Sequence, residues 1–185
     1  MIEKMQALET ERLRLEPLVP KHADALFEGL RDQRLYEFIV ERPPASLSAL
    51  RDRYRMLAHR RSPDDSEGWL NWALWSRIDR RYVGNVPATV YPNRSAQIAY
   101  VLTSDHWGKG FACDAVKAMV AHLGEHYSVI RALARVDTRN ERSIALLEAL
   151  GFERVATHRQ AEKIRGAWQR SPAVSEAPSR CLWWA

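Results

Sequence analysis

A short segment in the second half of the chain has the residue types of a phosphate-binding turn. It reads Trp107-Gly108-Lys109-Gly110-Phe111-Ala112, and an alternating stretch over 98–102 precedes it. Apolar residues at helical spacing follow it: Ala115, Val116, Met119, Val120 and Leu123. Glycines let a backbone approach a ligand closely, and the unpaired first-turn N–H groups lie at the positive end of the helix dipole. A strand, a glycine turn and a helix in this order predict a site for a phosphate-containing ligand.

Three classes of phosphate site have to be distinguished. A nucleotide-binding P-loop is excluded, because Lys109 is followed by Gly110 and not by Ser or Thr. A dinucleotide site would need a third small residue after the two glycines and an acidic residue about 20 residues further on. Position 113 is Cys113 instead, and Asp137, after the next predicted strand, is more distant than that rule asks. The third class is a site for the pyrophosphate of coenzyme A.

Two further motifs follow the glycine segment. Asn140 and Ser143 lie in Asn-Glu-Arg-Ser, and Leu150-Gly151-Phe152 comes after them. A G-x-G pair alone is weak evidence, whereas the three motifs in this order and spacing are specific. Together they resemble the GNAT superfamily of N-acetyltransferases, in particular the ribosomal-protein alanine acetyltransferase (RimJ/RimL-like) branch.

The resemblance implies an acetyl-CoA-dependent N-acetyltransferase. An acceptor amine, either a protein N-terminus or a small amine, would attack the thioester directly in a ternary complex. The glycine segment would bind the pyrophosphate through its backbone amides, and the preceding strand would bind the pantetheine arm. Trp107 stands where the wider family has Gln or Arg. The implied cofactor-binding residues are Tyr100, Val101, Leu102, Trp107, Gly108, Lys109, Gly110, Phe111, Ala112, Asn140 and Ser143.

Asn140 and Ser143 are also the two catalytic candidates that the resemblance implies. Asn140 would hydrogen-bond the cofactor arm, although Asn is equally a good helix N-cap, and both roles can hold at once. Ser143 would help to protonate the thiolate leaving group; the alternative is an ordinary serine in the first turn of a helix. Lys109 would lie near the phosphates or be a solvated loop lysine.

Acid–base chemistry is where the sequence departs from the family pattern. Gln97 stands where similar proteins often have Glu, and Leu147 stands where many have a general-acid Tyr. A Gln side chain cannot accept a proton at neutral pH. The remaining candidates for the base are Glu67, Asp105, His106 or a chain of water molecules, and a solvated or structural role is favoured for His106. A coenzyme A-binding module with little or no turnover therefore stays an alternative, and a dinucleotide-binding protein is a third.

The elements around the glycine segment predict an α+β domain. A strand is predicted over 8–18, and helices begin at Pro20 and after the cap residue Ser46. Three antiparallel strands over 69–78, 82–91 and 96–102 lead into the glycine segment, where a dinucleotide fold would have a βαβ unit. A strand over 132–136, a helix over 140–150 and a strand over 152–162 follow. The resemblance implies the GNAT fold: a mixed, mostly antiparallel sheet with flanking helices, splayed in the middle around acetyl-CoA.

Composition limits the class of protein. The chain has 185 residues, of which 46% are hydrophobic, and this predicts one folded domain over 1–185. Its net charge of +5 would help to attract an anionic cofactor, but the arginines are scattered, so no nucleic-acid partner is expected. Two cysteines do not make a disulfide framework, and no metal site is predicted. No signal peptide or long apolar run is present, so a cytoplasmic protein without a membrane partner is expected.

The last part of the chain, 170–185, is atypical for the family. Similar proteins finish with a strand that helps to close the acceptor site, but Pro172 and Pro178 argue against a long central strand here. The apolar run Cys181-Leu182-Trp183-Trp184 is open to two interpretations. It is either a short final strand or a surface that docks on a partner subunit, as in a homodimer. The acceptor, the oligomeric state and the route of the proton are not determined by the sequence.

Overall fold

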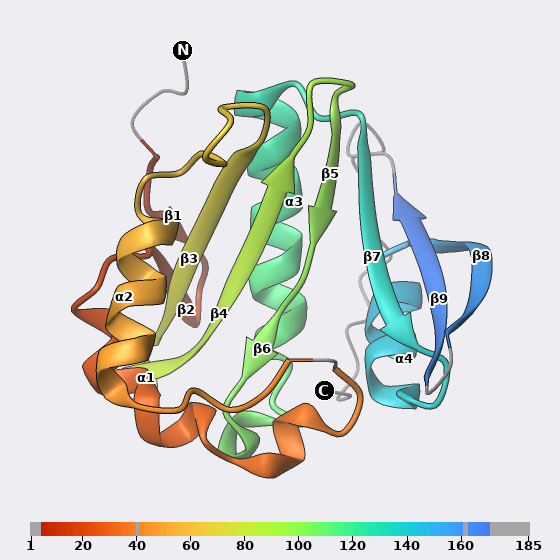
Figure 1. Ribbon diagram of the computed structural model, residues 1–185. Helices are drawn as coiled ribbons and strands as arrows, with labels where there is room; N and C mark the ends of the chain where they lie inside the picture. Colours follow the sequence, from red (N-terminus) through yellow and green to blue (C-terminus); the bar gives the residue numbers. More distant parts are fainter. Residues whose placement is uncertain (1–4, 40, 161–162, 171–185) are drawn as a thin grey trace.

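The computed structural model describes residues 5–39, 41–160 and 163–170. Within these residues a mixed sheet has the strand order β1-β2-β3-β4-β5-β7-β9-β8, and β6 pairs with β4 beside this path (Figure 1). The pair β5–β7 is parallel, and the other pairs are antiparallel. The strands are β1 Leu8–Glu9, β2 Leu13–Pro17, β3 Gly68–Ser76, β4 Arg81–Val90, β5 Ser95–Ile98, β6 Val101–Leu102, β7 Arg131–Asp137, β8 Glu153–Gln160 and β9 Lys163–Arg170.

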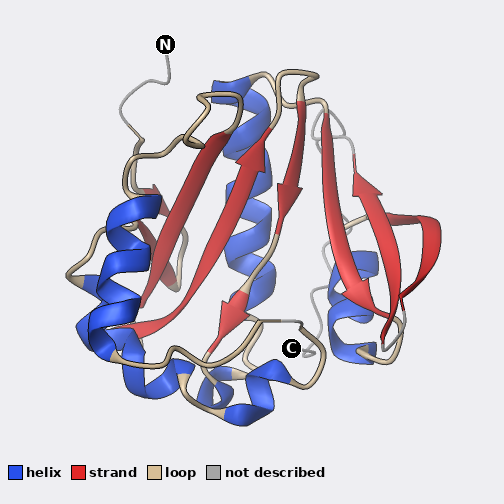
Figure 2. Cartoon of the chain, in the orientation of Figure 1, coloured by secondary structure: helices blue, strands red, loops and turns tan. Residues whose placement is uncertain are grey.

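Helices cover both faces of the sheet (Figure 2). They are α1 His22–Leu30, α2 Leu47–Leu57, α3 Phe111–Tyr127 and α4 Glu141–Ala149, with 3-10 turns at Gln33–Tyr36 and Ser104–His106. The larger core lies between the sheet and the pair α3 and α4, around Trp72, Met119 and Leu147. The smaller core lies under α1 and α2. None of the helices that the structure describes has the length and apolar character needed to span a bilayer.

Local signals in the sequence set the helix ends. Ser46 caps α2, because its hydroxyl oxygen accepts a hydrogen bond from Ala49 N at 3.1 Å. Gly110, with a φ of 75°, precedes α3, and Gly151, also at 75°, follows α4. The predicted helices after Pro20 and Ser46 are confirmed, and so is the α+β fold class.

Two predicted strands differ from the structure. The stretch 8–18 is a tight hairpin of β1 and β2, because Thr10 closes a turn on Leu13: Leu13 N donates to Thr10 Oγ1 at 2.9 Å, and Thr10 N donates to Leu13 O at 2.8 Å. The stretch 96–102 is split into β5 and β6. Strand β9 was not predicted, and it lies between β7 and β8. The interpretations of residues 171–185 lie outside the described residues.

Candidate active site

The sheet opens between β6 and the second half of β7. Residues 95–98 of β5 pair with residues 131–134 of β7. Further along, β6 pairs with β4, while residues 135–137 of β7 pair with β9 on the other side. Two chain segments that are hydrogen-bonded at one end of the sheet therefore diverge at the other end, as Figure 1 shows. The expected splay is present in the described residues.

The split between β5 and β6 lies opposite Pro87 of β4. Ala99 N donates to Pro87 O at 3.0 Å, but a proline has no N–H with which to return a bond to Ala99. The ladder resumes at β6, where Asn85 is opposite Val101 and Gly84 is opposite Leu102. Pro87 is therefore the sequence signal that could have predicted the break.

The backbone of the segment 100–102 is turned alternately toward β4 and toward the opening. Ala99 N and Thr103 N both donate to β4, to Pro87 O at 3.0 Å and Val83 O at 2.9 Å. Because successive residues of a strand point their backbone groups in opposite directions, the N–H groups of Tyr100 and Leu102 face β7. The carbonyl of Leu102 is engaged, since Trp107 Nε1 donates to it at 3.0 Å.

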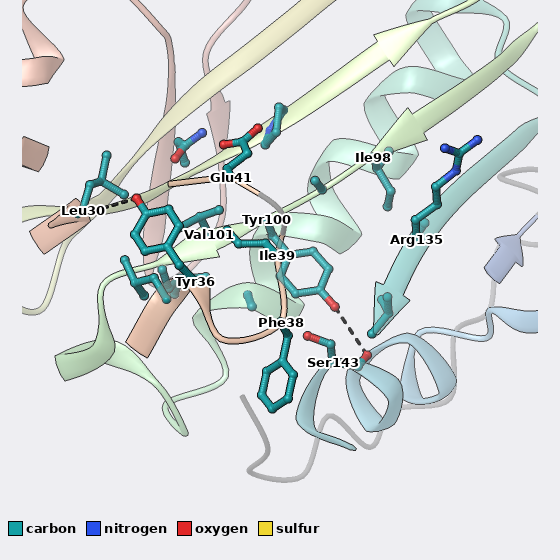
Figure 3. A pocket seen from close by; sticks show the side chains of 18 of the residues that line it. Leu30, Tyr36, Phe38, Ile39, Glu41, Ile98, Tyr100, Val101, Arg135 and Ser143 are labelled. Carbon is teal, nitrogen blue, oxygen red and sulfur yellow. Dashed lines mark hydrogen bonds between the residues drawn. The ribbon is translucent and has the colours of Figure 1, made fainter. Parts of the chain in front are cut away.

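A cleft of about 1150 Å³ runs through this opening. Its floor is formed by strands β3 to β7, and its walls by α2, the segment between α1 and α2, and the start of α4 (Figure 3). The aromatic residues that line it are Tyr36, Phe38, Tyr54, Trp69, Tyr100 and Trp107, and neutral amides on the floor are Asn71, Asn85 and Gln97. Because Ala112 and Ser143 also line it, the cleft reaches from the face covered by α1 and α2 to the first turns of α3 and α4.

The glycine segment has the backbone of an anion-binding turn. Gly108 and Gly110 have φ angles of 74° and 75°, in the left-handed region that favours glycine. Among the described residues, none accepts a hydrogen bond from the backbone amides of residues 108–112. Trp107 and Ala112 line the cleft, Lys109 is exposed, and the side chain of Phe111 is buried in the core. Gly108, Lys109, Gly110 and Phe111 are not among the residues that line the cleft.

Asn140, Ser143 and Tyr100 meet at the start of α4. Asn140 caps the helix, because its Oδ1 accepts from Ser143 N at 3.1 Å. The Tyr100 hydroxyl points at the same turn and donates to Ser143 O at 3.4 Å (Figure 3). Burial raises the pKa of Tyr100 to about 12, so this hydroxyl carries its proton at neutral pH. The sequence indicated only a backbone role for Tyr100, because nothing local reveals where its hydroxyl lies.

None of the three predicted base candidates, Glu67, Asp105 and His106, lines the cleft. His106 is buried, its Nδ1 lies 2.7 Å from Thr103 Oγ1, and its Nε2 lies 3.2 Å from Arg81 Nη2. Burial, followed by the charge of Arg81, lowers the pKa of His106. Glu67 accepts from Trp69 Nε1 at 2.9 Å, and Asp105 is exposed outside the cleft. The contacts of His106 and Glu67 are those of structural side chains.

The positions that depart from the family pattern have different surroundings. Gln97 lines the cleft, whereas Leu147 is fully buried in the larger core and does not reach it. The carboxylates that do line the cleft were not among the predicted base candidates: they are Glu37, Glu41, Asp137 and Glu141. Glu41 pairs with Arg53 at 3.1 Å, and the buried Asp137 pairs with Arg139 at 2.9 Å. Their place in the cleft depends on the tertiary fold and not on a local motif.

Comparison with known proteins agrees with this geometry. The family model for acetyltransferase (GNAT) domains matches residues 12–153. The chain is 29% identical over 165 residues to "Uncharacterized N-acetyltransferase p20" of Bacillus licheniformis, covering 88% of this chain and 90% of that protein. The ribosomal-protein-S5-alanine acetyltransferase of Vibrio fischeri has a TM-score of 0.78 at 17% identity, covering 92% and 99% of the two chains. RimL, a ribosomal L7/L12 alpha-N-protein acetyltransferase solved with coenzyme A, has a TM-score of 0.77 at 16% identity, covering 90% and 98%.

Proposed function

The chain belongs to the GNAT family of acetyltransferases, and from this premise we propose that it moves an acetyl group from acetyl-CoA to an amine in the cleft. The observation that carries the proposal is the path of the cleft. It joins the first turns of α3 and α4, where Ala112 and Ser143 line it, to a cavity under α1 and α2, through the opening between β6 and β7. A two-substrate transfer needs such a path, because both partners must reach one point from different sides.

The proposed cofactor site uses backbone groups more than side chains. The amides of residues 108–112 would hold the pyrophosphate, because they lie at the positive end of α3 and have no protein acceptor among the described residues. The backbone of Tyr100 would hydrogen-bond the pantetheine arm in the opening. Asn140 uses Oδ1 as the cap of α4, which leaves its amide N–H groups for the arm.

Acetyl-CoA supplies the acetyl group as an activated thioester, and the residues around it would assist the transfer. The N–H of Leu102, which faces the opening, would donate to the carbonyl oxygen as negative charge develops on it. Hydroxyl groups at the start of α4, those of Ser143 and Tyr100, would donate a proton to the departing sulfur. Gln97 cannot accept the amine proton, so water would carry it to a carboxylate at the rim of the cleft.

The acceptor is proposed to be a protein N-terminus or a small amine. The cavity under α1 and α2 is open and carries aromatic side chains, which suits the end of a peptide as well as a small amine. The similarity in fold to RimL, whose name specifies a protein N-terminus, supports the first of these acceptors. A coenzyme A-binding module with little turnover is the second candidate, favoured by Gln97 and Leu147.

The proposal includes a single domain over 1–185 and a cytoplasmic setting.

Two measurements separate these functions. Calorimetric titration with coenzyme A, with desulfo-coenzyme A and with NAD tests which cofactor binds. Release of free thiol from acetyl-CoA in the presence of peptides and small amines tests turnover. Binding of coenzyme A with acceptor-dependent thiol release is expected. Binding without thiol release would favour the second candidate, and absence of coenzyme A binding would contradict both.

Gly110→Asp tests the pyrophosphate assignment. At Gly110 a Cβ would lie 2.9 Å from Arg12 Nη2, the φ is 75°, and the new carboxylate would repel a diphosphate. We expect coenzyme A binding to weaken by about a hundredfold or more, roughly 2.7 kcal/mol. Gly151→Asp is the matched control, because Gly151 has the same φ but nothing within 4 Å of a Cβ. Unchanged affinity in Gly110→Asp would remove the pyrophosphate from this turn.

A further inference from the structure

Arg12 connects the N-terminal hairpin to the glycine segment. It lies in the turn between β1 and β2, and its Nη1 donates to Lys109 O at 2.7 Å. Its Nε donates to Asp114 Oδ2, in the first turn of α3, at 2.8 Å. Its guanidinium lies over the Phe111 ring, 5.3 Å from the centroid. One side chain therefore contacts the residues immediately before, at and just after the beginning of α3.

We infer that Arg12 is a positioning residue for cofactor binding, which acts by fixing the direction of the amides in the glycine segment. This inference rests on the proposed coenzyme A site. In a planar trans peptide the C=O and the next N–H point in opposite directions. Because the Lys109 carbonyl is directed at Arg12, the Gly110 N–H is directed away from Arg12. Arg12 thus binds the carbonyl side of the peptide between Lys109 and Gly110, and the Gly110 N–H on the opposite side points to where the anion would bind.

Arg12 also offsets an unfavourable charge. Asp114 lies in the first turn of α3, where a carboxylate suits the helix dipole but repels a bound diphosphate. Both side chains are partly shielded, at 34% exposure for Arg12 and 26% for Asp114, so their pairing is less screened than that of a surface pair. Without Arg12, the Asp114 charge would act on the cofactor phosphates unopposed.

Neighbouring residues restrict the position of the Arg12 backbone and of its guanidinium. Arg77 N donates to Arg12 O at 3.0 Å, which ties the hairpin turn to the end of β3. On the other side, Gly110 leaves the space that the guanidinium occupies, since a Cβ there would lie 2.9 Å from Arg12 Nη2. A lysine could not reproduce these contacts, because two of them come from different nitrogens of one rigid, planar group.

The test compares Arg12→Met, Arg12→Lys and Asp114→Asn with the double variant Arg12→Met/Asp114→Asn. Arg14→Met is the control, because Arg14 is a neighbouring, exposed arginine that pairs with Glu9 at 3.3 Å and not with the glycine segment. Affinity for coenzyme A is measured by calorimetry. The kcat and the KM values for acetyl-CoA and for the amine are measured separately.

Arg12→Met is expected to weaken coenzyme A binding and raise the KM for acetyl-CoA by about tenfold, the size of a lost charge-assisted contact. Arg12→Lys should fall between it and the wild type. The kcat and the amine KM should stay within about twofold of the wild type, as should all values for Arg14→Met. Asp114→Asn alone should leave affinity unchanged or tighter, and in the double variant it should recover part of the loss.

A purely structural role for Arg12 predicts a different pattern. Asp114→Asn would then weaken binding, or the double variant would bind no better than Arg12→Met, and either result would overturn the inference. Wild-type affinity in both Arg12 variants would overturn it too. If the wild type itself does not bind coenzyme A, the proposed function fails, and this outcome is seen before any variant is compared. If Arg12→Met does not fold, Arg12→Lys and Asp114→Asn decide the question.

Discussion

Proton transfer to the leaving thiolate is assigned to hydroxyl groups in the proposed reaction. Leu147 is buried in the larger core and has an aliphatic side chain, so it cannot supply a proton. The Tyr100 hydroxyl approaches the same turn of α4 from the strand side, 3.4 Å from Ser143 O. Its pKa of about 12 keeps it protonated, so it can act as an acid but not as a base near neutral pH. Ser143, on α4 and lining the cleft, is the second hydroxyl.

Ser143→Ala should lower kcat more than it lowers cofactor affinity. If Ser143 donates to the sulfur only as the thiolate forms, its loss removes an interaction made in the transition state, and kcat should fall about tenfold to a hundredfold. Steady-state kinetics with acetyl-CoA and calorimetry with coenzyme A measure the two effects. Tyr100→Phe is the companion variant, and an additional loss in the double variant would indicate two separate donors.

Equal losses of kcat and affinity in Ser143→Ala would assign Ser143 to binding alone. The pH profile gives an independent check on Tyr100. Because its raised pKa of about 12 lies far above neutrality, kcat should show no alkaline decline from Tyr100 in the range from neutral to moderately alkaline pH. A decline well below pH 12 that disappears in Tyr100→Phe would contradict the pKa assigned to this hydroxyl.

At the scale of elements, the signals that could be read from the sequence were local ones. Ser46, Gly110 and Gly151 set helix ends through their own backbone or side-chain preferences, and the helices follow as expected. The split of β5 and β6 was missed because it depends on Pro87 lying opposite Ala99, which is a property of the pairing. Strand β9 was not predicted, although it pairs with its sequence neighbour β8 as well as with the distant β7.

The same division between local signals and long-range contacts applies to the candidate site. The glycine segment, Asn140 and Ser143 were found because each belongs to a short motif with its own spacing, although their roles stay predictions. The hydroxyl of Tyr100 and the contacts of Arg12 were not found, because both depend on segments brought together by the sheet. Short-range patterns predict which backbone is presented to a ligand, whereas long-range contacts decide how that backbone is held.

Gly84→Ala tests whether the position of β6 matters for the reaction. Gly84 lies opposite Leu102, and a Cβ there would be 2.9 Å from Leu102 Cα and closer still to Val101 O. Strand β6 would have to move, and with it the Leu102 N–H that faces the opening. We expect kcat to fall about tenfold and the free energy of unfolding to fall by about 1–3 kcal/mol. Kinetics and urea denaturation measure the two.

The control for Gly84→Ala separates stability from catalysis. Gly151→Ala introduces a Cβ at a φ of 75° with nothing within 4 Å, so it should cost stability through backbone strain while kcat is retained. If Gly84→Ala lost only stability, in the same way as Gly151→Ala, then the placement of β6 would have no part in the chemical step.

At the scale of the whole molecule, the sheet separates two regions with different tasks. Helices α3 and α4 pack on the larger core, and their first turns border the cleft from one face. Helices α1 and α2 pack on the smaller core and form the wall of the cavity on the other face. The cleft crosses the sheet only where β6 and β7 separate. If the amine binds on this face as proposed, its specificity can vary through α1, α2 and their connection without disturbing the turn proposed to bind the pyrophosphate.

Three buried histidines make the stability of this architecture depend on pH. His22, His106 and His122 are 1%, 2% and 7% exposed, and burial is the main cause that lowers the pKa of each. Hydrogen bonds agree with neutral rings: Val19 N donates to His22 Nδ1 at 3.1 Å, and Arg81 can only donate to His106 Nε2. Among the described residues, His122 Nε2 has no hydrogen-bond partner.

Because the folded pKa values lie below the unfolded value of about 6.5, the unfolded chain binds more protons in acid. The stabilisation is complete above about pH 6.5 and is lost as pH falls through the folded pKa values. Urea denaturation should give an unfolding free energy that is level above neutrality and declines as pH falls below about 6.5, with a slope of at most about 4 kcal/mol per pH unit for three groups. His122→Phe should reduce that slope, because the ring contacts with Trp72 and Tyr127 can be kept while one proton site is removed. An unaltered slope in His122→Phe would mean that His122 is not among the groups that bind a proton on unfolding.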